Sequence, residues 1–546
     1  MGIKRDIIMF DEYKKEMTRN SAKLIIITTI TSLLIAVTSF IGPLLIKDFV
    51  ESYPKDRQIL KPLLVILLTY VVCYLFKLLL SSLKGKMSIN FKTRETCQLI
   101  LMMFKMRYEK LIQLEPTYLV EKINTSVNTF YQLYSDSIAS YIVSIFTIIG
   151  CLCFMLCINV WIAVILIVII PLNIAGYKLL NKRLQKMCIR LQNVCAKNFA
   201  DILSITSAVD YIKQSPNYEL IINFIKKKTK IIHSENANVG VYAGLISLTL
   251  GDIINMINNL LYIYVTVLMV NAKINLADYI FITMVISMFF PALNNIVGAG
   301  INLRDIKGVY EFVENELINN IEESGEERCE MIENVSFDIH DIGYNDKLLI
   351  KNGHFDVKRG DIVMIQGESG SGKTTIMKGL VKLLHIDGIS LNGKELSEYD
   401  NNSVRAKIAF FSQNVPIITG TIKENILLGQ NEKKLDINKL KNKLFMKKFF
   451  DEKEGLDHII LENGSNLSGG DKQKIALARL YLEQPDVIIL DEITSSIDKE
   501  SSDVIFEDII NSFKESIIFV IAHDDTVKKY CNRFIKILNK ECIEVE

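Results

Sequence analysis

Residues 362–374 read IVMIQGESGSGKT, and this stretch decides the fold of the C-terminal part of the chain. The apolar run 362–366 is typical of a buried strand, and the glycine-rich turn after it ends in Lys373 and Thr374. Glycines let successive backbone N–H groups point at one anion, and the N-terminus of the next helix adds a favourable dipole. The stretch therefore predicts a phosphate-binding loop between a strand and a helix.

The spacing within this loop also predicts roles for individual side chains. Lys373 is placed to reach the outer phosphates of a nucleoside triphosphate, and the Thr374 hydroxyl is placed to bind Mg²⁺. A chance glycine-rich turn would not explain why both residues stand at the required offset. The nucleotide-binding residues predicted from the loop are Gly367, Glu368, Ser369, Gly370, Ser371, Gly372, Lys373, Thr374 and Thr375.

A second apolar run, residues 487–492, reads VIILDE and ends in two carboxylates. A buried parallel strand would place Asp491 at its carboxyl end, beside the phosphate loop, as a ligand of Mg²⁺. Glu492 would then be placed to polarise the attacking water. Such a run is often only a strand end, but together with the phosphate loop it predicts a magnesium ligand and a catalytic carboxylate.

Short Ile- and Val-rich runs alternate with helical stretches over residues 331–546, which predicts an α/β domain with a mainly parallel sheet. The glutamate-rich stretch 311–330 reads as the end of a helix followed by a solvated linker. Residues 1–310 have a different character and predict a separate membrane domain.

That membrane domain is predicted from long apolar runs, each of about the 20 residues that a membrane-spanning helix requires. Concentration of apolar residues into spans accounts for the positive mean hydropathy, +0.25, of the 546-residue chain. The predicted spans are residues 24–46, 62–83, 138–158, 160–180, 241–270 and 276–300. The two long connections, 84–135 and 178–240, keep a helical pattern and are expected to extend the membrane helices beyond the bilayer.

The distribution of Lys and Arg predicts the orientation of these spans. Residues 1–23 carry six, 84–137 eight and 178–240 eleven, whereas 47–61 carries four and 271–275 only Lys273. By the positive-inside rule, the N-terminus, both long connections and the C-terminal domain face the cytoplasm. The expected protein is therefore a multi-pass cell-membrane protein with the lipid bilayer as a partner.

Composition argues against two other classes of protein. The 63 Lys and Arg nearly balance the 62 Asp and Glu, so no basic surplus indicates a nucleic-acid partner. The ten cysteines do not form an evenly spaced disulfide framework. Cys151, Cys153 and Cys157 cluster inside an apolar run without a neighbouring His or carboxylate, so they are expected to be ordinary membrane-helix residues rather than a metal site.

Residues 466–474 read NLSGGDKQK and resemble the LSGGQ signature of ATP-binding cassette (ABC) ATPases, in the expected place before the Asp-Glu strand. The run TGTIKENI, residues 419–426, is typical of the exporter-type members. ENGSN, residues 462–466, resembles their X-loop. Three further residues resemble the Q-loop glutamine, the D-loop aspartate and the switch histidine of the family: Gln413, Asp498 and His523.

The resemblance implies an exporter-type half-transporter, with a six-helix membrane domain fused to a P-loop ATPase, and ATP and Mg²⁺ as cofactors. Two such halves would stack head to tail, so that Ser468, Gly469 and Gly470 of one close on the ATP held by the other. The partner would be a second copy or a related chain. Gln413 would join Thr374 and Asp491 as a magnesium ligand, and His523 would join Glu492 in catalysis.

Two features depart from the family pattern. Asp471 and Lys474 stand where Gln and Arg are usual, and the extra carboxylate is expected to weaken dimer closure modestly. The aromatic residue that stacks on adenine is also not at its usual spacing. We predict that Tyr344 stacks on adenine, and Phe337 and His340 are the alternatives.

Polar residues inside a membrane bundle usually face its interior. Asp252, Asn255 and Asn259 share one helical face and predict a substrate cavity that selects cationic groups. Helix–helix hydrogen bonding, or pairing of Asp252 with Lys77, is an equally good interpretation. Lys77 could instead extend to the membrane surface.

The leading functional hypothesis is ATP-driven export of a substrate such as a peptide or a small amphipathic molecule. An importer on the same fold, as in metal-chelate uptake, is an alternative. A membrane ATPase with a regulatory role is another, and the polar cavity favours transport over it.

Overall fold

The computed structural model describes residues 2–56, 59–214, 217–344, 347–412, 415–428, 430, 436, 440, 446, 449–451, 455–492, 499–522 and 525–545. The chain divides into two compact units. One unit comprises Met1–Met106 and Lys110–Ile321, and the other comprises Glu322–Glu546 together with Arg107–Glu109. They are treated separately below as the helical unit and the sheet unit.

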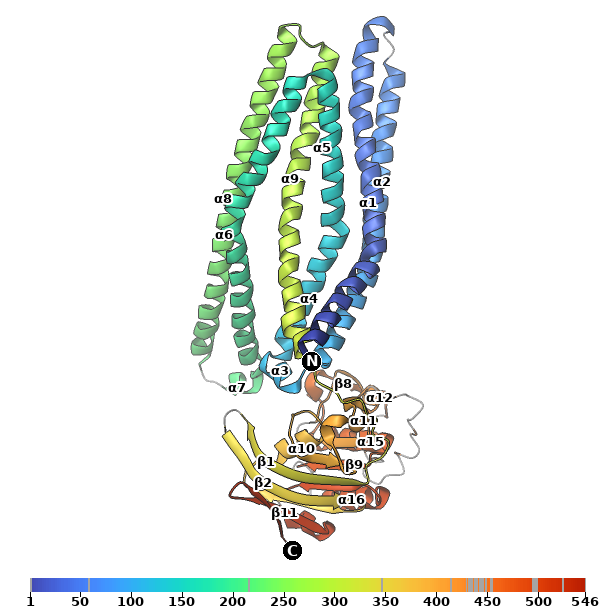
Figure 1. The fold of residues 1–546 in the computed structure, drawn as a ribbon, viewed down its shortest axis with the longest axis vertical. Helices are drawn as coiled ribbons and strands as arrows, with labels where there is room; N and C mark the ends of the chain where they lie inside the picture. The colour runs from blue at the N-terminus through green and yellow to red at the C-terminus, as the bar shows by residue number, and fades with distance from the viewer. Residues whose placement is uncertain are drawn as a thin grey trace. The chain divides into compact units, whose positions relative to one another are not determined.

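The helical unit consists of long helices (Figure 1). Its α-helices are α1 (Gly2–Asp56), α2 (Leu60–Phe104), α3 (Tyr108–Gln113), α4 (Pro116–Gln132), α5 (Ile138–Ile158), α6 (Val160–Ser207), α7 (Val209–Gln214), α8 (Tyr218–Val270) and α9 (Leu276–Phe312). A π-helical turn, η1 (Leu133–Ser137), joins α4 to α5, and η2 (Val313–Leu317) with the 3₁₀ turn η3 (Ile318–Asn320) follows α9. The first two residues of α3, Tyr108 and Glu109, are grouped with the sheet unit.

Each apolar run predicted to span a membrane lies within one of these helices, and both long connections are largely helical extensions. Among the residues that the structure describes, five helical stretches are long and apolar enough to cross a bilayer. They are Met9–Tyr53, Leu60–Phe104, Pro116–Ile158, Tyr218–Val270 and Leu276–Ile296. The first part of α6, Val160–Gly176, is apolar but shorter.

Neighbouring helices pack in pairs, α1 with α2, α5 with α9 and α6 with α8 (Figure 1). Asn159 separates α5 from α6, and its side chain accepts hydrogen bonds from the backbone N–H groups of Trp161 and Ile162, which caps α6. Gly150 allows α1 to approach α5, because a Cβ there would lie 3.0 Å from the ring of Phe40. Close helix packing at small residues is usual in membranes, where burial of apolar surface supplies little attraction between helices.

The sheet unit contains one ten-stranded sheet and a separate two-stranded sheet, β7 with β8. The strands are β1 (Asn334–Tyr344), β2 (Lys347–Lys358), β3 (Ile362–Gly367), β4 (Ile389–Leu391), β5 (Lys394–Glu395), β6 (Ile408–Phe411), β7 (Gly420–Thr421), β8 (Ile459–Ile460), β9 (Val487–Asp491), β10 (Ile517–Ile521), β11 (Arg533–Leu538) and β12 (Glu541–Val545). The order in the large sheet is β5-β4-β1-β2-β12-β11-β3-β10-β9-β6. Strands β11, β3, β10, β9 and β6 are parallel neighbours.

The parallel strands are covered on both sides, as expected for an α/β domain. Strands β9 and β10 are buried along their whole length. The α-helices of this unit with described bounds are α10 (Lys373–Leu380), α11 (Asn401–Arg405), α12 (Ile422–Leu427), α15 (Gly469–Glu483) and α16 (Lys499–Ser512), with the 3₁₀ turns η4 (Leu396–Glu398), η6 (Glu462–Gly464) and η7 (Asp525–Tyr530). The predicted fold class, a helical membrane domain with an α/β P-loop domain, is confirmed.

Candidate nucleotide-binding site

The site lies at the carboxyl ends of two parallel strands. The glycine-rich loop follows β3, Asp491 ends β9 with Glu492 directly after it, and β10 is hydrogen-bonded between β3 and β9. Because the carboxyl ends of parallel strands meet at the same edge of a sheet, the two segments come together although 117 positions separate Thr374 from Asp491.

The loop backbone requires its glycines. Gly370 and Gly372 adopt φ angles of 78° and 102°, in the left-handed region that residues with a Cβ avoid. At Gly367 a Cβ would lie 2.8 Å from the Ser371 hydroxyl and 3.2 Å from the Ile537 carbonyl oxygen. The loop therefore forms a tight cradle in which α10 begins directly after Gly372.

Two side chains of the loop, Ser371 and Lys373, have buried polar groups. The Ser371 hydroxyl is buried and makes no hydrogen bond within the described part of the chain. The Lys373 ammonium donates to the backbone oxygens of Gly367 and Glu368, at 2.8 and 2.9 Å, so it lies inside the curl of the loop. Burial lowers the pKa of Lys373, and the nearby Glu492 and Asp491 carboxylates oppose that effect.

A hydrogen bond joins the loop to the acidic strand end. The Thr374 hydroxyl donates to Asp491 Oδ2 at 2.8 Å. Burial raises the pKa of Asp491, while the Thr374 hydroxyl favours its charged form. Hydroxyl and carboxylate oxygens are the ligands that Mg²⁺ prefers, so this pair and the loop around it fit a magnesium–nucleotide complex.

Glu492 follows β9 in a conformation that is unusual for a residue with a side chain. Its φ angle is 53°, and its backbone N–H donates to the Ile521 carbonyl oxygen at 3.0 Å. Backbone strain of this kind collects at functional sites, where the surrounding structure holds it in place. The bond to Ile521, the last residue of β10, fixes Glu492 at the edge of the sheet where the phosphate loop lies.

The signature residues begin α15. Ser468 is the N-cap, and its hydroxyl accepts from the Asp471 backbone N–H at 3.1 Å, while Asp471 Oδ2 accepts from the Ser468 N–H at 3.2 Å. The Asp471 carboxylate is buried and lies 3.8 Å from the Lys474 ammonium. The two departures from the family pattern therefore work together, because the extra negative charge caps the helix and faces a cation.

One residue that the sequence analysis missed also positions this helix. The Arg479 guanidinium, on α15, donates to the backbone oxygens of Pro416 and Asn425, both at 2.8 Å. It thereby ties the signature helix to the segment around β7 and α12. The sequence did contain a signal for this role, since Arg479 stands alone among the apolar residues of 475–482 and a charged side chain there requires partners.

Some predicted site residues have no structural account here. Gln413, Asp498 and His523 lie outside the described residues. Tyr344 ends β1, but its side chain is not described. Of the two alternatives, Phe337 is a core residue, because it is fully buried and its ring stacks on that of Phe355 with 4.4 Å between the ring centroids. His340 is exposed, and its ring contacts the Asn352 side chain.

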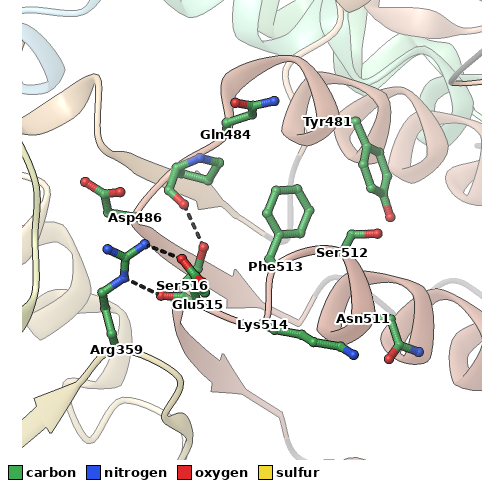
Figure 2. A pocket seen from close by; sticks show the side chains of 11 residues that line it. Arg359, Tyr481, Gln484, Asp486, Asn511, Ser512, Phe513, Lys514, Glu515 and Ser516 are labelled. Carbon is green, nitrogen blue, oxygen red and sulfur yellow. Dashed lines mark hydrogen bonds and ion pairs between the residues drawn. The ribbon is translucent and has the colours of Figure 1, made fainter.

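A different cavity of about 540 Å³ lies at the opposite ends of the same strands (Figure 2). Its lining residues 484–486 precede β9, residues 511–516 precede β10, and Arg359 precedes β3. Arg359 is already engaged, since it donates to the backbone oxygen of Glu515 at 2.8 Å and to its carboxylate at 3.1 Å. Among the described residues, none that was predicted for the nucleotide site lines this cavity.

In the helical unit, the residues predicted for a substrate cavity are exposed. Asp252, Asn255 and Asn259 are exposed on α8, and none of them lines the two described cavities of this unit, of about 270 and 220 Å³. Lys77, on α2, makes no ion pair with Asp252 in the described structure. The neighbouring Asn258 has a buried side-chain oxygen without a hydrogen-bond partner.

The fold and site define a class: a P-loop nucleotide-binding domain joined to a bundle of membrane-length helices. Two family models match this chain, the ABC transporter transmembrane region over residues 25–293 and the ABC transporter model over residues 350–495. The chain therefore belongs to the ABC transporters, and its fold is of the exporter type.

A solved structure and several curated proteins are similar to the chain. The structure of a bacterial Atm1-family ABC exporter with ATP bound aligns over 95% of this chain and 94% of that one, with a TM-score of 0.83 and 17% identity, which establishes similarity of fold. The SPbeta prophage-derived sublancin-168-processing and transport ATP-binding protein of Bacillus subtilis is 36% identical over 204 residues, 36% of this chain and 28% of that protein. The ATP-dependent lipid A-core flippase of Vibrio parahaemolyticus is 36% identical over 184 residues, 33% of this chain and 32% of that protein. The chain matches only about a third or less of the length of each of these two curated proteins.

Proposed function

We propose that this chain is one half of a dimeric exporter, which couples ATP hydrolysis to the movement of a substrate out across the cell membrane. The observation that carries the proposal is the hydrogen bond between Thr374 and Asp491, which joins the phosphate loop to the acidic end of β9. It brings two distant motifs into one site, in a chain whose other unit consists of membrane-length helices.

In this proposal each residue of the site has a separate task. Lys373 and the backbone N–H groups of the loop bind the phosphates, and Thr374 and Asp491, with Gln413, hold Mg²⁺. When bound, Mg²⁺ supplies positive charge that offsets the charge of the outer phosphates. Glu492 accepts a hydrogen bond from the attacking water and orients it, and His523 assists at the terminal phosphate.

A second half completes the site. The N–H groups at the start of α15 and the Ser468 hydroxyl form an anion site, since a helix N-terminus carries partial positive charge. The Ser468 oxygen accepts its cap bond from Asp471, which leaves its hydroxyl hydrogen available as a donor to a phosphate. The partner is a second copy of this chain or a related half.

Direction and cargo are proposed from the relatives and from charge. One relative is described as a sublancin-168-processing and transport protein and another as a lipid A-core flippase, so the cargo class proposed here is peptides and small amphipathic molecules. The excess of Lys and Arg in 84–137 and 178–240 supports a cytoplasmic location for these stretches and for the ATPase.

The test is flux in proteoliposomes that contain the purified full-length protein. When ATP is added outside the vesicles, only protein molecules whose ATPase domain faces the outside can use it. These molecules should carry a dansyl-labelled amphipathic peptide into the lumen, and the Glu492→Gln variant should not. Movement of labelled cargo out of preloaded vesicles under the same conditions would indicate an importer. ATPase activity without flux of peptides, lipids or amphipathic dyes would indicate a regulatory role.

Magnesium dependence gives a second check on the site. Removal of Mg²⁺ with a chelator should abolish turnover, and Thr374→Ala should raise the Mg²⁺ concentration required for half-maximal activity about tenfold or more. Thr374→Ser keeps the hydroxyl and should restore the requirement to near that of the wild type. An unchanged requirement in Thr374→Ala would contradict the assignment of this side chain.

A further inference from the structure

A cavity of about 220 Å³ lies among α1, α2 and α9 of the helical unit. Thr38 and Ser39 line it from α1, Thr69, Tyr70 and Lys77 from α2, and Ser287 from α9. Residues 69, 70, 73 and 77 share one face of α2, because helical positions separated by four and seven or eight residues point the same way. We refer to this space as the Lys77 cavity.

Lys77 is a cation inside an apolar span. It stands seven residues before Lys84, or about 10 Å along the helix. Helical side chains lean toward the N-terminus of their helix, which on α2 is away from Lys84 and from the cytoplasmic surface expected beside it. Lys77 lines the cavity together with Cys73 and Tyr70, about one and two turns before it, and is an exposed residue of this unit. An intramembrane lysine is costly unless a cavity or a partner accommodates it.

Only two of the described polar side chains that line the cavity have hydrogen-bond donors left for a ligand. The hydroxyls of Thr38, Ser39, Thr69 and Ser287 donate to carbonyl oxygens of their own helices, at 2.9, 2.7, 2.7 and 2.6 Å. Their hydrogens are therefore occupied, and the donors left to a ligand are the Lys77 ammonium and the Tyr70 hydroxyl. Neither makes a hydrogen bond or an ion pair within the part of the chain that the structure describes, and no carboxylate is among the lining residues.

This arrangement selects an anion. A group bound by Lys77 and Tyr70 must accept hydrogen bonds and carry negative charge, as carboxylate and phosphate oxygens do. The occupied hydroxyls retain oxygen lone pairs that can accept from N–H or O–H groups of the same ligand. Met284, Met288 and Pro43 add apolar surface for a hydrocarbon portion.

The volume of the Lys77 cavity limits the size of the ligand that it can enclose. A volume of 220 Å³ is below the ~300–1,000 Å³ typical of a pocket that encloses a drug-sized ligand. The cavity therefore takes the charged end of a longer molecule, whose remainder extends along the helices. The Tyr70 hydroxyl faces Gly42 of α1, where a Cβ would lie 3.5 Å from it, an ordinary van der Waals distance.

We infer that the Lys77 cavity binds the carboxylate or phosphate of an anionic amphipathic cargo. This inference rests on the proposed transport function and specifies its substrate class. It differs from the cationic preference that Asp252 suggested, because the described cavity is lined by a lysine and by no acid.

The test is binding of a fluorescent fatty acid, 11-(dansylamino)undecanoic acid, to the full-length protein in phosphatidylcholine nanodiscs, compared with its uncharged methyl ester. Wild type should bind the acid about tenfold or more tightly than the ester, because only the acid pairs with Lys77. Lys77→Met should bind both within about twofold, and Lys77→Arg should keep the preference. Tyr70→Phe, which removes one oxygen and little volume, should reduce it partly.

The matched control is Lys61→Met, which removes the same charge from the other end of α2, outside the cavity. It should behave as the wild type. An undiminished preference for the acid in Lys77→Met, or an equal loss in Lys61→Met, would overturn the inference.

A second arm distinguishes cargo from bilayer lipid, since both can present an oxyanion on a hydrocarbon chain. Added phosphatidylglycerol in the nanodiscs should not displace the acid from wild type. Displacement that depends on Lys77 would assign the cavity to a lipid and overturn its assignment to cargo. Binding needs no ATP, so failure of this inference and failure of the proposed transport function, measured by ATPase activity and flux, are separate results.

Discussion

The nucleotide site and the membrane bundle place their polar groups in opposite ways. In the sheet unit, functional residues occur in short contiguous motifs, and strand ends bring Thr374 within 2.8 Å of Asp491. In the helical unit, the Lys77 cavity draws scattered residues from α1, α2 and the distant α9. A site made from motifs can be read from the chain, whereas a site made from single side chains of separate helices becomes visible only after the helices pack.

Loss of the catalytic carboxylate should give the largest effect. Glu492→Gln keeps the shape of the side chain but removes the base, so ATP hydrolysis should fall at least about a hundredfold while ATP binding persists. Steady-state phosphate release and equilibrium nucleotide binding measure the two. Glu395→Gln, an exposed carboxylate on β5, is the control and should retain full activity. Normal turnover in Glu492→Gln would end the assignment of this site.

The next effect tests whether the motif site is completed by a second chain. In the Glu492→Gln background, Mg-ATP should produce a closed dimer, and Ser468→Arg should abolish it, because a large side chain would fill the place of the terminal phosphate. Mass photometry of the detergent-purified protein with and without ATP measures the assembly. If the Ser468→Arg protein closed at the same ATP concentration as the protein with Ser468 intact, the start of α15 would not contact a phosphate.

A smaller effect is expected from the exposed acid of the membrane bundle. If Asp252 lines a substrate path, Asp252→Asn should reduce stimulation of ATPase by cationic amphiphiles several-fold, since the change removes only one charge. Stimulation by anionic amphiphiles should persist in Asp252→Asn and fall in Lys77→Met. Equal losses for both charge types in Asp252→Asn would leave helix packing as its role.

Asp252→Cys gives an independent reading of the same position. A water-soluble thiol reagent should label it in the absence of nucleotide, and ATP with vanadate should suppress the labelling. Absence of labelling in every state would remove Asp252 from the substrate path.

The smallest effect should come from the departure in the signature. Asp471→Ala removes one half of the cap on α15 and should cost about 1 kcal/mol, which lowers the melting temperature of a domain of this size by about 2–4 °C. Asp471→Gln should cost less, because its amide oxygen can still accept the Ser468 N–H. Differential scanning fluorimetry measures both.

The same variant separates the structural account from the expectation drawn from sequence. If Asp471 weakened dimer closure by its charge, Asp471→Gln in the Glu492→Gln background would close at a clearly lower ATP concentration. The cap bond and the 3.8 Å approach to Lys474 predict instead a change within about twofold. A large drop in the required ATP concentration would favour the expectation from sequence.

By itself the sequence predicted the class of both units, which the family models confirm, and it located the segments of the candidate nucleotide site. Loop, strand end and signature are local patterns whose geometry follows from backbone preferences, so GESGSGKT and VIILDE carry their structure with them. Membrane-length apolar runs likewise predict helices, because a backbone in lipid must satisfy its own hydrogen bonds.

Only the tertiary structure decided which residues of separate elements meet. It placed Phe337 in the core, turned the Asp471 carboxylate to the helix cap, and joined Arg479 to Pro416 and Asn425. It also put Lys77 and Tyr70 at one cavity with hydroxyls of α1 and α9, whereas Asp252 lines neither described cavity of this unit. Helical periodicity tells which residues share a face, but the neighbour of that face depends on packing between helices, and no local preference in the chain encodes it.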